Sequence, residues 1–164
     1  MADLFDLTGK TALITGASRG IGEAIAHLLA HYGAHVICTS RKRDGCQAVS
    51  DAIRAKGLQA EASAMHIGDT AAIDAVFDGL AVQGRTVDIL VNNAAANPYY
   101  GPLLDMDLRS FEKILEVNLR GYFYSSQRAA RQMAGGGAIV NIASVNAERP
   151  VPDQAAYSMT KAGI

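Results

Sequence analysis

Three residues near the end of the chain have the types and spacing of a carbonyl/alcohol redox site. Ser144 and Tyr157 are thirteen positions apart, and Lys161 follows Tyr157 by four. On a helix, positions i and i+4 share one face, so Tyr157 and Lys161 would lie side by side. A nearby ammonium favours the phenolate form of a tyrosine, which makes the tyrosine usable as an acid or base nearer neutral pH. Ser144 could donate a hydrogen bond to a carbonyl oxygen as negative charge builds there.

A tyrosine four residues before a lysine is weak support on its own, because such pairs are common on ordinary helix surfaces. The plain alternative is a solvated lysine beside a half-buried tyrosine. A helix is expected over 155–162, with Pro152 and Asp153 at its start. Support for a site therefore has to come from the segments upstream.

The composition is that of a globular domain: 164 residues, 49% hydrophobic and 19% charged, which is enough to bury a core. The net charge of -1 gives no electrostatic case for nucleic acid or an anionic membrane. Cys38 and Cys46 lack metal or redox spacing, which indicates reduced thiols in a cytoplasmic protein. The acidic segment 1–6 and the lack of a long apolar run favour neither a signal peptide nor a membrane span. We expect one soluble domain over 1–164.

Apolar strand-like runs alternate with amphipathic helical runs, which predicts a parallel sheet covered by helices. The expected strands are 11–15, 35–40, 60–67, 87–92 and 138–142. The expected helices between them are 21–32, 45–56, 70–83 and 108–133. Right-handed crossovers then give an α/β fold, a doubly wound Rossmann-type parallel sheet.

The helix expected at 21–32 should turn an apolar stripe toward the sheet. The stripe consists of Ile21, Ile25, Leu28, Leu29 and Tyr32. The other side carries Glu23, His27 and His31, each four apart, which could in principle hold a metal. A solvated polar face is the better interpretation because no further ligand is evident, and we expect no metal site.

The first expected strand runs directly into a glycine-rich turn and then into the first helix. Glycines allow a tight turn and let the backbone approach a pyrophosphate, whose charge lies against the helix N-terminus. The spacing is G-x-x-x-G-x-G over Gly16, Gly20 and Gly22, and differs from G-x-G-x-x-G. Any tight strand-to-helix connection can use glycine. In this strand–turn–helix position, the motif nevertheless predicts nucleotide binding.

Five motifs, in order and at matching spacing, resemble those of the short-chain dehydrogenase/reductase family. They are T-G-x-x-x-G-x-G at 15–22, Asn92-Asn93-Ala94, Asn118, Ser144, and Tyr157 with Lys161. The resemblance covers essentially the whole chain. It implies an NAD(P)-dependent oxidoreductase that transfers a hydride between a nicotinamide cofactor and a carbonyl or secondary alcohol.

The resemblance implies a role for each catalytic candidate. Tyr157 would be the general acid in reduction and the base in oxidation. Lys161 would favour ionisation of Tyr157 and bind the nicotinamide ribose, while Ser144 would orient the substrate oxygen. Asn118 would hold a water that links Lys161 to solvent; a helix-interior amide bonded to backbone is no real alternative, because the family role uses such a local structure too. The residues implied to bind the cofactor are Gly16, Ser18, Arg19, Gly20, Ile21, Gly22, Ser40, Arg41, His66, Ile67, Asn93, Ala94, Tyr157 and Lys161.

The end of the second expected strand bears on the choice of cofactor. An acidic residue there would accept hydrogen bonds from the ribose 2′-hydroxyl of NAD. The sequence instead reads Cys-Thr-Ser-Arg-Lys-Arg over 38–43. Arg41, together with Arg19, could clamp a 2′-phosphate, although a solvated basic loop is the alternative. We expect NADP, with NAD less favoured.

Two positions depart from the family pattern. His66-Ile67 stands where family members often carry Asp-Val, with the Asp against the adenine; histidine can still donate or accept. Ala95 replaces the glycine that ends the family's usual Asn-Asn-Ala-Gly motif. In the following loop, Tyr99 and Tyr100 could line a substrate cleft or pack on neighbouring loop residues, and both interpretations stay open. This loop, with the ends of the second and third strands, is also similar to the NADPH-dependent carbonyl reductase branch, at a weaker level.

Family chains continue beyond the position of Ile164. We therefore expect a C-terminally truncated form that lacks further strands and the segment closing over substrate. If these 164 residues were the whole polypeptide, we would expect little or no turnover; a piece of a longer chain is the favoured interpretation. The full-length form should be a homotetramer or dimer acting on a small-molecule substrate. A non-catalytic dinucleotide-binding module is the alternative, although it has no use for the intact Ser144, Tyr157 and Lys161. Sugar-nucleotide epimerase or dehydratase activity is disfavoured by the glycine spacing.

Overall fold

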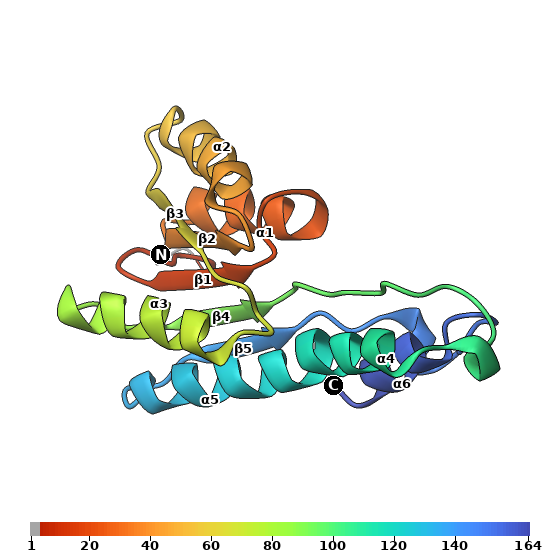
Figure 1. Cartoon of the computed structure of the whole chain (residues 1–164). Helices are drawn as coiled ribbons and strands as arrows, with labels where there is room; N and C mark the ends of the chain where they lie inside the picture. Colours follow the sequence, from red (N-terminus) through yellow and green to blue (C-terminus); the bar gives the residue numbers. More distant parts are fainter. Residues whose placement is uncertain (1–3) are drawn as a thin grey trace.

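The computed structural model describes residues 4–164, so the first three residues of the N-terminal segment considered above lie outside it. Within this range, five parallel strands form one sheet in the order β3-β2-β1-β4-β5. The strands are β1 (Thr11–Thr15), β2 (His35–Ser40), β3 (Ala60–Ala64), β4 (Ile89–Asn92) and β5 (Ala138–Asn141). The predicted doubly wound α/β fold is confirmed (Figure 1).

Helices cover both faces of this sheet (Figure 1). The helices are α1 (Gly20–His31), α2 (Arg43–Arg54), α3 (Thr70–Val82), α4 (Leu108–Leu115), α5 (Gly121–Gln132) and α6 (Ala155–Ala162). Ala12 and Ile14 lie in one core with α1 and α2, whereas Leu13 lies in a second core with α3 and α5. Successive strand side chains point to opposite faces, so β1 contributes to both cores. Among residues 4–164, no helix is long and apolar enough to cross a membrane.

Three strands are shorter than the sequence predicted. β3 ends at Ala64 and not at 67, β4 begins at Ile89 and not at 87, and β5 ends at Asn141 and not at 142. The early end of β3 has a visible cause. After the Met65 N–H donates to Ser40 O at 2.8 Å, the chain turns, and the Asp69 N–H donates back to His66 O at 2.9 Å. His66 therefore lies in a turn just after the carboxyl end of β3.

The apolar stripe predicted for α1 is wrong in part. Ile21 and Leu28 are 62% and 56% exposed, although Ile25 and Leu29 do pack against the core. The fully buried positions of the helix are Gly22, Ala26 and Ala30. These small residues face the sheet, so the helix approaches it too closely to admit the larger side chains of the predicted stripe.

The single helix predicted over 108–133 is also wrong in part, because a π-helical turn interrupts it. This turn, η2 (Glu116–Arg120), separates α4 from α5 and contains Asn118. A π-turn inside a helix holds an extra residue per turn and recurs at functional sites. Two short 3-10 turns, η1 (Leu103–Asp105) and η3 (Val145–Ala147), complete the elements of the described chain.

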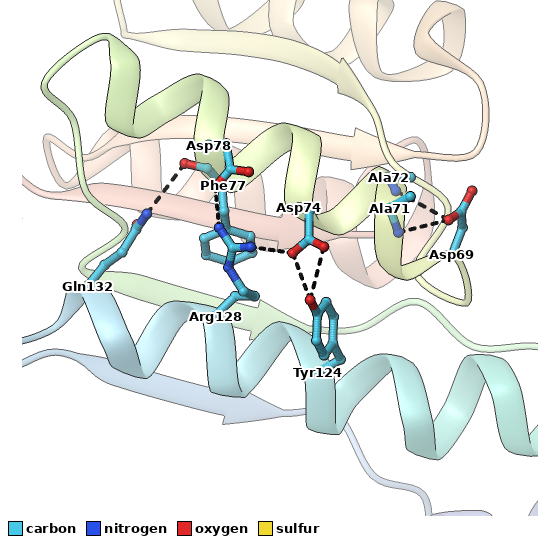
Figure 2. Close-up of polar contacts among 9 residues, drawn as sticks. All are labelled: Asp69, Ala71, Ala72, Asp74, Phe77, Asp78, Tyr124, Arg128 and Gln132. Carbon is cyan, nitrogen blue, oxygen red and sulfur yellow. Dashed lines mark hydrogen bonds and ion pairs between the residues drawn. The ribbon is translucent and has the colours of Figure 1, made fainter.

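A charged network ties α3 to α5 (Figure 2). Arg128 of α5 pairs with Asp74 and Asp78 of α3, and the Tyr124 hydroxyl donates to Asp74 at 2.8 Å. The guanidinium also lies 5.7 Å from the centroid of the Phe77 ring. Only 18% of the Arg128 side chain is exposed, so these bonds are less screened than ordinary surface pairs. The network therefore fixes α5, and with it the π-turn, against α3.

Candidate active site

The carboxyl ends of β1 and β4 lie side by side where the strand order reverses, the place where open α/β sheets bind ligands. Asn93 joins the two ends: its side-chain NH₂ donates to Thr15 O at 2.9 Å and to Gly16 O at 3.1 Å. In return, Thr15 Oγ1 accepts the backbone N–H groups of Asn93 and Ala94 at 2.9 and 3.0 Å. The predicted Asn-Asn-Ala motif thus holds the glycine-rich turn in place.

The glycines of this turn are required by its geometry. Gly16 has a φ of +68°, and a Cβ there would lie 2.9 Å from the Cα of Ala94. A Cβ on Gly22 would lie 2.5 Å from Gly16 O, closer than real contacts allow. Gly20 also has a positive φ, of +60°, but has open space within 4 Å. The turn is therefore compact toward the sheet and open above Gly20, as a phosphate cradle requires.

A cleft of about 680 Å³ opens beside this turn, a volume suited to a cofactor. Most of the predicted cofactor residues line it: Gly16, Ser18, Arg19, Gly20, Ile21, Ser40, Arg41, His66, Ile67, Asn93 and Ala94. Gly22 is buried under the turn and does not line the cleft, and neither do Tyr157 and Lys161. The sheet thus brings together the ends of four strands that lie far apart in sequence.

The cleft is positively charged. Arg19, Arg41 and Lys113 line it, and none of the described residues that line it is an Asp or Glu. Lys113 was not among the predicted cofactor residues. It lies in α4, five positions before Asn118, a spacing that does not place the two side chains on one helix face, so no local pattern indicated it.

Ser144 follows β5 and caps the short turn η3. Its Oγ accepts the backbone N–H of Asn146 at 3.2 Å. A hydroxyl that accepts in this way keeps its own proton free to donate. Ser144 therefore keeps a proton to donate, and its role toward a substrate oxygen stays a prediction.

Tyr157 and Lys161 lie side by side on α6. The Lys161 Nζ is 5.8 Å from the centroid of the Tyr157 ring and 5.3 Å from that of Tyr122, and it donates to Ile142 O at 2.6 Å. Only 2% of Lys161 is exposed, and burial lowers the pKa of its ammonium. The helix spans Ala155–Ala162, as predicted, and Asp153, one of the expected entry residues just before it, adopts a left-handed φ of +64°.

Asn118 is fully buried, and all its described hydrogen bonds are to protein groups. Its Oδ1 accepts the Ala96 N–H at 2.8 Å, and its Nδ2 donates to Ala96 O at 3.0 Å and to Thr160 Oγ1 at 3.1 Å. These are the contacts of an amide bonded largely to backbone, a local structure that the role implied by the resemblance also uses, so that role stays a prediction. Through them Asn118 joins the loop after β4 to the helix that carries Tyr157.

A polar cluster that the sequence analysis did not identify ties together three segments of the site. The Gln154 Oε1 accepts from the side chains of Asn97 at 3.4 Å and Asn146 at 3.2 Å. Asn97 follows β4, Asn146 follows Ser144, and Gln154 precedes α6. No spacing could have indicated a contact across 57 positions. The cluster keeps these three segments at fixed separation.

The two loop tyrosines differ in their surroundings. The Tyr99 hydroxyl donates to Pro102 O at 2.9 Å within its own loop, while its ring lines a small hollow beside Tyr157. Tyr99 therefore packs within its own loop and also borders this hollow, whereas Tyr100 is 69% exposed. Elsewhere in residues 4–164, no group of three or more His, Cys, Asp or Glu side chains is placed to hold a metal ion.

Comparison with known proteins settles the family. A family model for short chain dehydrogenase matches residues 10–164. The chain belongs to the short-chain dehydrogenase family. The predicted family resemblance is thereby confirmed.

Among curated members of the short-chain dehydrogenase family, gluconate 5-dehydrogenase of Gluconobacter oxydans (strain 621H) is 38% identical over 99% of this chain. Dehydrogenase/reductase SDR family member 4 of Bos taurus is 33% identical over 100% of it. The chain spans 64% and 60% of the lengths of these two relatives. The crystal structure of a metagenomic short-chain oxidoreductase in complex with NADP is 40% identical, with a TM-score of 0.91 over 96% of this chain and 72% of that one.

Proposed function

We propose that the chain is the dinucleotide-binding and catalytic domain of an NADP-dependent oxidoreductase acting on a carbonyl or secondary alcohol. One observation carries the proposal: a basic cleft without carboxylates lies at the switch point of the sheet, and a buried lysine lies beside a half-buried tyrosine on the helix after the neighbouring strand β5. Membership in the short-chain dehydrogenase family favours an enzyme over a non-catalytic binding module.

The residues of the cleft fit NADP. The open space above Gly20 and the N-terminus of α1 suit a pyrophosphate, because backbone N–H groups and the helix dipole favour negative charge there. Arg41 and Arg19 are placed for a 2′-phosphate, which a carboxylate at the end of β2 would repel. The NADP bound to the metagenomic relative supports the same choice.

When bound, the nicotinamide supplies or accepts the hydride. Tyr157 would give a proton to the substrate oxygen in reduction and take it back in oxidation. Lys161 lies beside Tyr157, with its Nζ 5.8 Å from the centroid of the ring, and would bind the nicotinamide ribose. Ser144 would donate a hydrogen bond to the same oxygen and hold it in position.

A small-molecule substrate, self-association and a cytoplasmic location complete the proposal. Phe123 and Leu108, on the long helix interrupted by η2, are 69% and 75% exposed, which supports a surface for a second copy. Cys38 and Cys46 are free and buried, as reduced thiols would be in the cytoplasm.

The test is NADPH oxidation by the purified protein with a panel of ketones and aldehydes. We expect Tyr157→Phe to lower turnover by about 10²-fold or more while leaving NADPH affinity unchanged, because only the proton donor is lost. Tyr100→Phe, at an exposed tyrosine, is the matched control and should keep wild-type rates. Tight NADPH binding with no oxidation, or equal rates for wild type and Tyr157→Phe, would refute the catalytic assignment.

A further inference from the structure

Lys161 has a buried ammonium that no described carboxylate balances. Only 2% of the residue is exposed, and its Nζ donates to Ile142 O at 2.6 Å. Within residues 4–164, no ion pair includes Lys161. Burying a charge is costly unless other groups compensate it, and one neutral carbonyl compensates an ammonium with three protons only in part. A charged Lys161 therefore requires a further stabilising group.

The aromatic ring of Tyr122 lies against this ammonium. The Nζ of Lys161 is 5.3 Å from the centroid of the Tyr122 ring, closer than the 5.8 Å that separate it from the centroid of Tyr157. A cation within about 6 Å of a ring centroid is attracted by the negative face of the ring, most strongly where water is excluded. Tyr122 is only 4% exposed, so water is largely excluded from this contact. The geometry is that of a buried cation–π pair.

The hydroxyl of Tyr122 does not explain why a tyrosine is buried here. It has no hydrogen-bond partner among the described residues, although it is itself buried. Burial, with Tyr157 nearby, raises the pKa of Tyr122, so the phenol stays neutral and forms no ion pair with the lysine. The part of Tyr122 that faces the ammonium is therefore its ring.

The backbone around the ring is held closely. Tyr122 is the second residue of α5 and follows the π-turn η2 directly. A Cβ on the preceding Gly121 would lie 2.4 Å from Ile67 O, so the start of α5 packs tightly against the segment after β3. From the π-turn itself, Asn118 donates to Thr160, the neighbour of the lysine, at 3.1 Å. Both members of the pair are thus fixed relative to η2.

We propose that Tyr122 is a positioning residue whose ring keeps the Lys161 side chain charged and in place beside Tyr157. The inference deepens the proposed function and rests on it, because Lys161 would meet the nicotinamide ribose as a charged donor. It also gives a reason for a bulky aromatic residue at the start of α5, where its hydroxyl is left unpaired.

The proposal has a consequence for the titration of Lys161. Burial lowers the pKa of its ammonium, and the face of a nearby ring opposes this effect. Among the described residues, the titratable groups that face the ammonium are Tyr122 from α5 and Tyr157 from α6, while Ile142 O after β5 is a neutral acceptor. Removing the Tyr122 ring should therefore lower the pKa of Lys161 further.

NMR titration of the protein labelled with carbon-13 at the lysine Cε measures this effect. The Lys161 signal is the one that is missing from Lys161→Met. We expect Tyr122→Leu to move the midpoint of the Lys161 titration down by about one pH unit, as the loss of a water-shielded cation–π contact requires. Tyr122→Phe should keep the wild-type midpoint, because it removes only the unpaired hydroxyl.

Two further proteins keep the test decisive. Tyr122→Phe made with 3,4,5-trifluorophenylalanine keeps the shape of the ring but withdraws charge from its face, so the Lys161 midpoint should fall even if Tyr122→Leu does not fold. Tyr124→Leu is the matched control. It removes a ring from the same helix, but the Tyr124 hydroxyl bonds to Asp74 of α3, so the Lys161 midpoint should stay at its wild-type value.

The outcomes separate this inference from the proposed function, because the titration needs neither cofactor nor turnover. An unchanged midpoint in the folded Tyr122→Leu and fluorinated proteins would overturn the inference and leave Tyr122 as an ordinary core residue. An equal fall in Tyr124→Leu would also overturn it, since general loosening of α5 would then be the cause. A wild-type protein that oxidises no NADPH, with Lys161 shifted as expected in the variants, would refute the proposed function but not the cation–π pair.

Discussion

The side chain of Asn118 makes two hydrogen bonds to the backbone of Ala96, 22 residues earlier in the chain. Its Oδ1 accepts the Ala96 N–H at 2.8 Å, and its Nδ2 donates to Ala96 O at 3.0 Å. This paired geometry imitates a backbone bridge between the loop after β4 and the π-turn. A third bond, to Thr160, extends the connection to the helix of Tyr157 and Lys161. The amide is therefore a structural joint between the cleft and the catalytic candidates.

Asn118→Asp should weaken this joint. The substitution keeps the shape of the side chain but replaces the Nδ2 donor with a carboxylate oxygen that faces Ala96 O. Because the site is fully buried, we expect the free energy of unfolding to fall by about 1–3 kcal/mol at pH 7, as measured by urea denaturation. Asn97→Asp, at an exposed amide, is the control and should cost less than about 1 kcal/mol. Equal losses would show that the joint contributes no special stability.

Lys161 should make stability depend on pH in the alkaline range. Burial lowers the pKa of its ammonium below the ordinary 10.5, so between the lowered value and 10.5 the unfolded state binds more protons than the folded state. The free energy of unfolding contributed by Lys161 should therefore be constant below this window and rise with pH inside it. Urea denaturation of wild type and Lys161→Met from pH 7 to 10.5 measures the difference, with Lys56→Met as an exposed control. A difference that falls with rising pH would contradict the assignment.

Arg41 should determine the preference for NADP over NAD. We expect Arg41→Ala to weaken NADP binding by about 10–100-fold, because a charge-assisted hydrogen bond to the 2′-phosphate is lost. Binding of NAD should change little, because NAD carries no phosphate there. Titration calorimetry with both cofactors measures the two affinities. Lys42→Ala, the control, removes an adjacent positive charge that does not line the cleft and should change both cofactor affinities little. If Lys42→Ala weakened NADP binding as much as Arg41→Ala, the effect would be a diffuse electrostatic one.

The two aspartates of the network between α3 and α5 should contribute unequally to the stability of the fold (Figure 2). The Asp74 side chain is 35% exposed and bonds to both Arg128 and Tyr124, whereas the Asp78 side chain is 67% exposed and bonds to Arg128 alone. We expect Asp74→Asn to lower the free energy of unfolding by about 1–3 kcal/mol, and Asp78→Asn by less than about 1 kcal/mol. Urea denaturation compares them. A larger loss for Asp78→Asn would contradict this prediction, because it would show that Asp78 contributes more to stability than Asp74.

The sequence by itself determined the order of the elements and the motifs on them. Strands and helices differ in the period of their apolar residues, so β1 and β2 could be assigned to the residue from local pattern alone. The glycine-rich turn could be identified as well, because the backbone conformation at Gly16 is a local property of the chain. The Tyr157–Lys161 pair followed from helical spacing.

Contacts between distant segments were decided only by the tertiary structure. The burial of Gly22 in α1, and not of Leu28, depends on how closely the helix approaches the sheet. The side chain of Asn118 in the π-turn bonds to the backbone of Ala96, and the contact between His66 and Lys113 joins residues 47 positions apart. Periodicity describes one element at a time, whereas these features arise where two elements meet. The sequence thus determined which groups could do chemistry, and the packing of the elements decided what each of them faces.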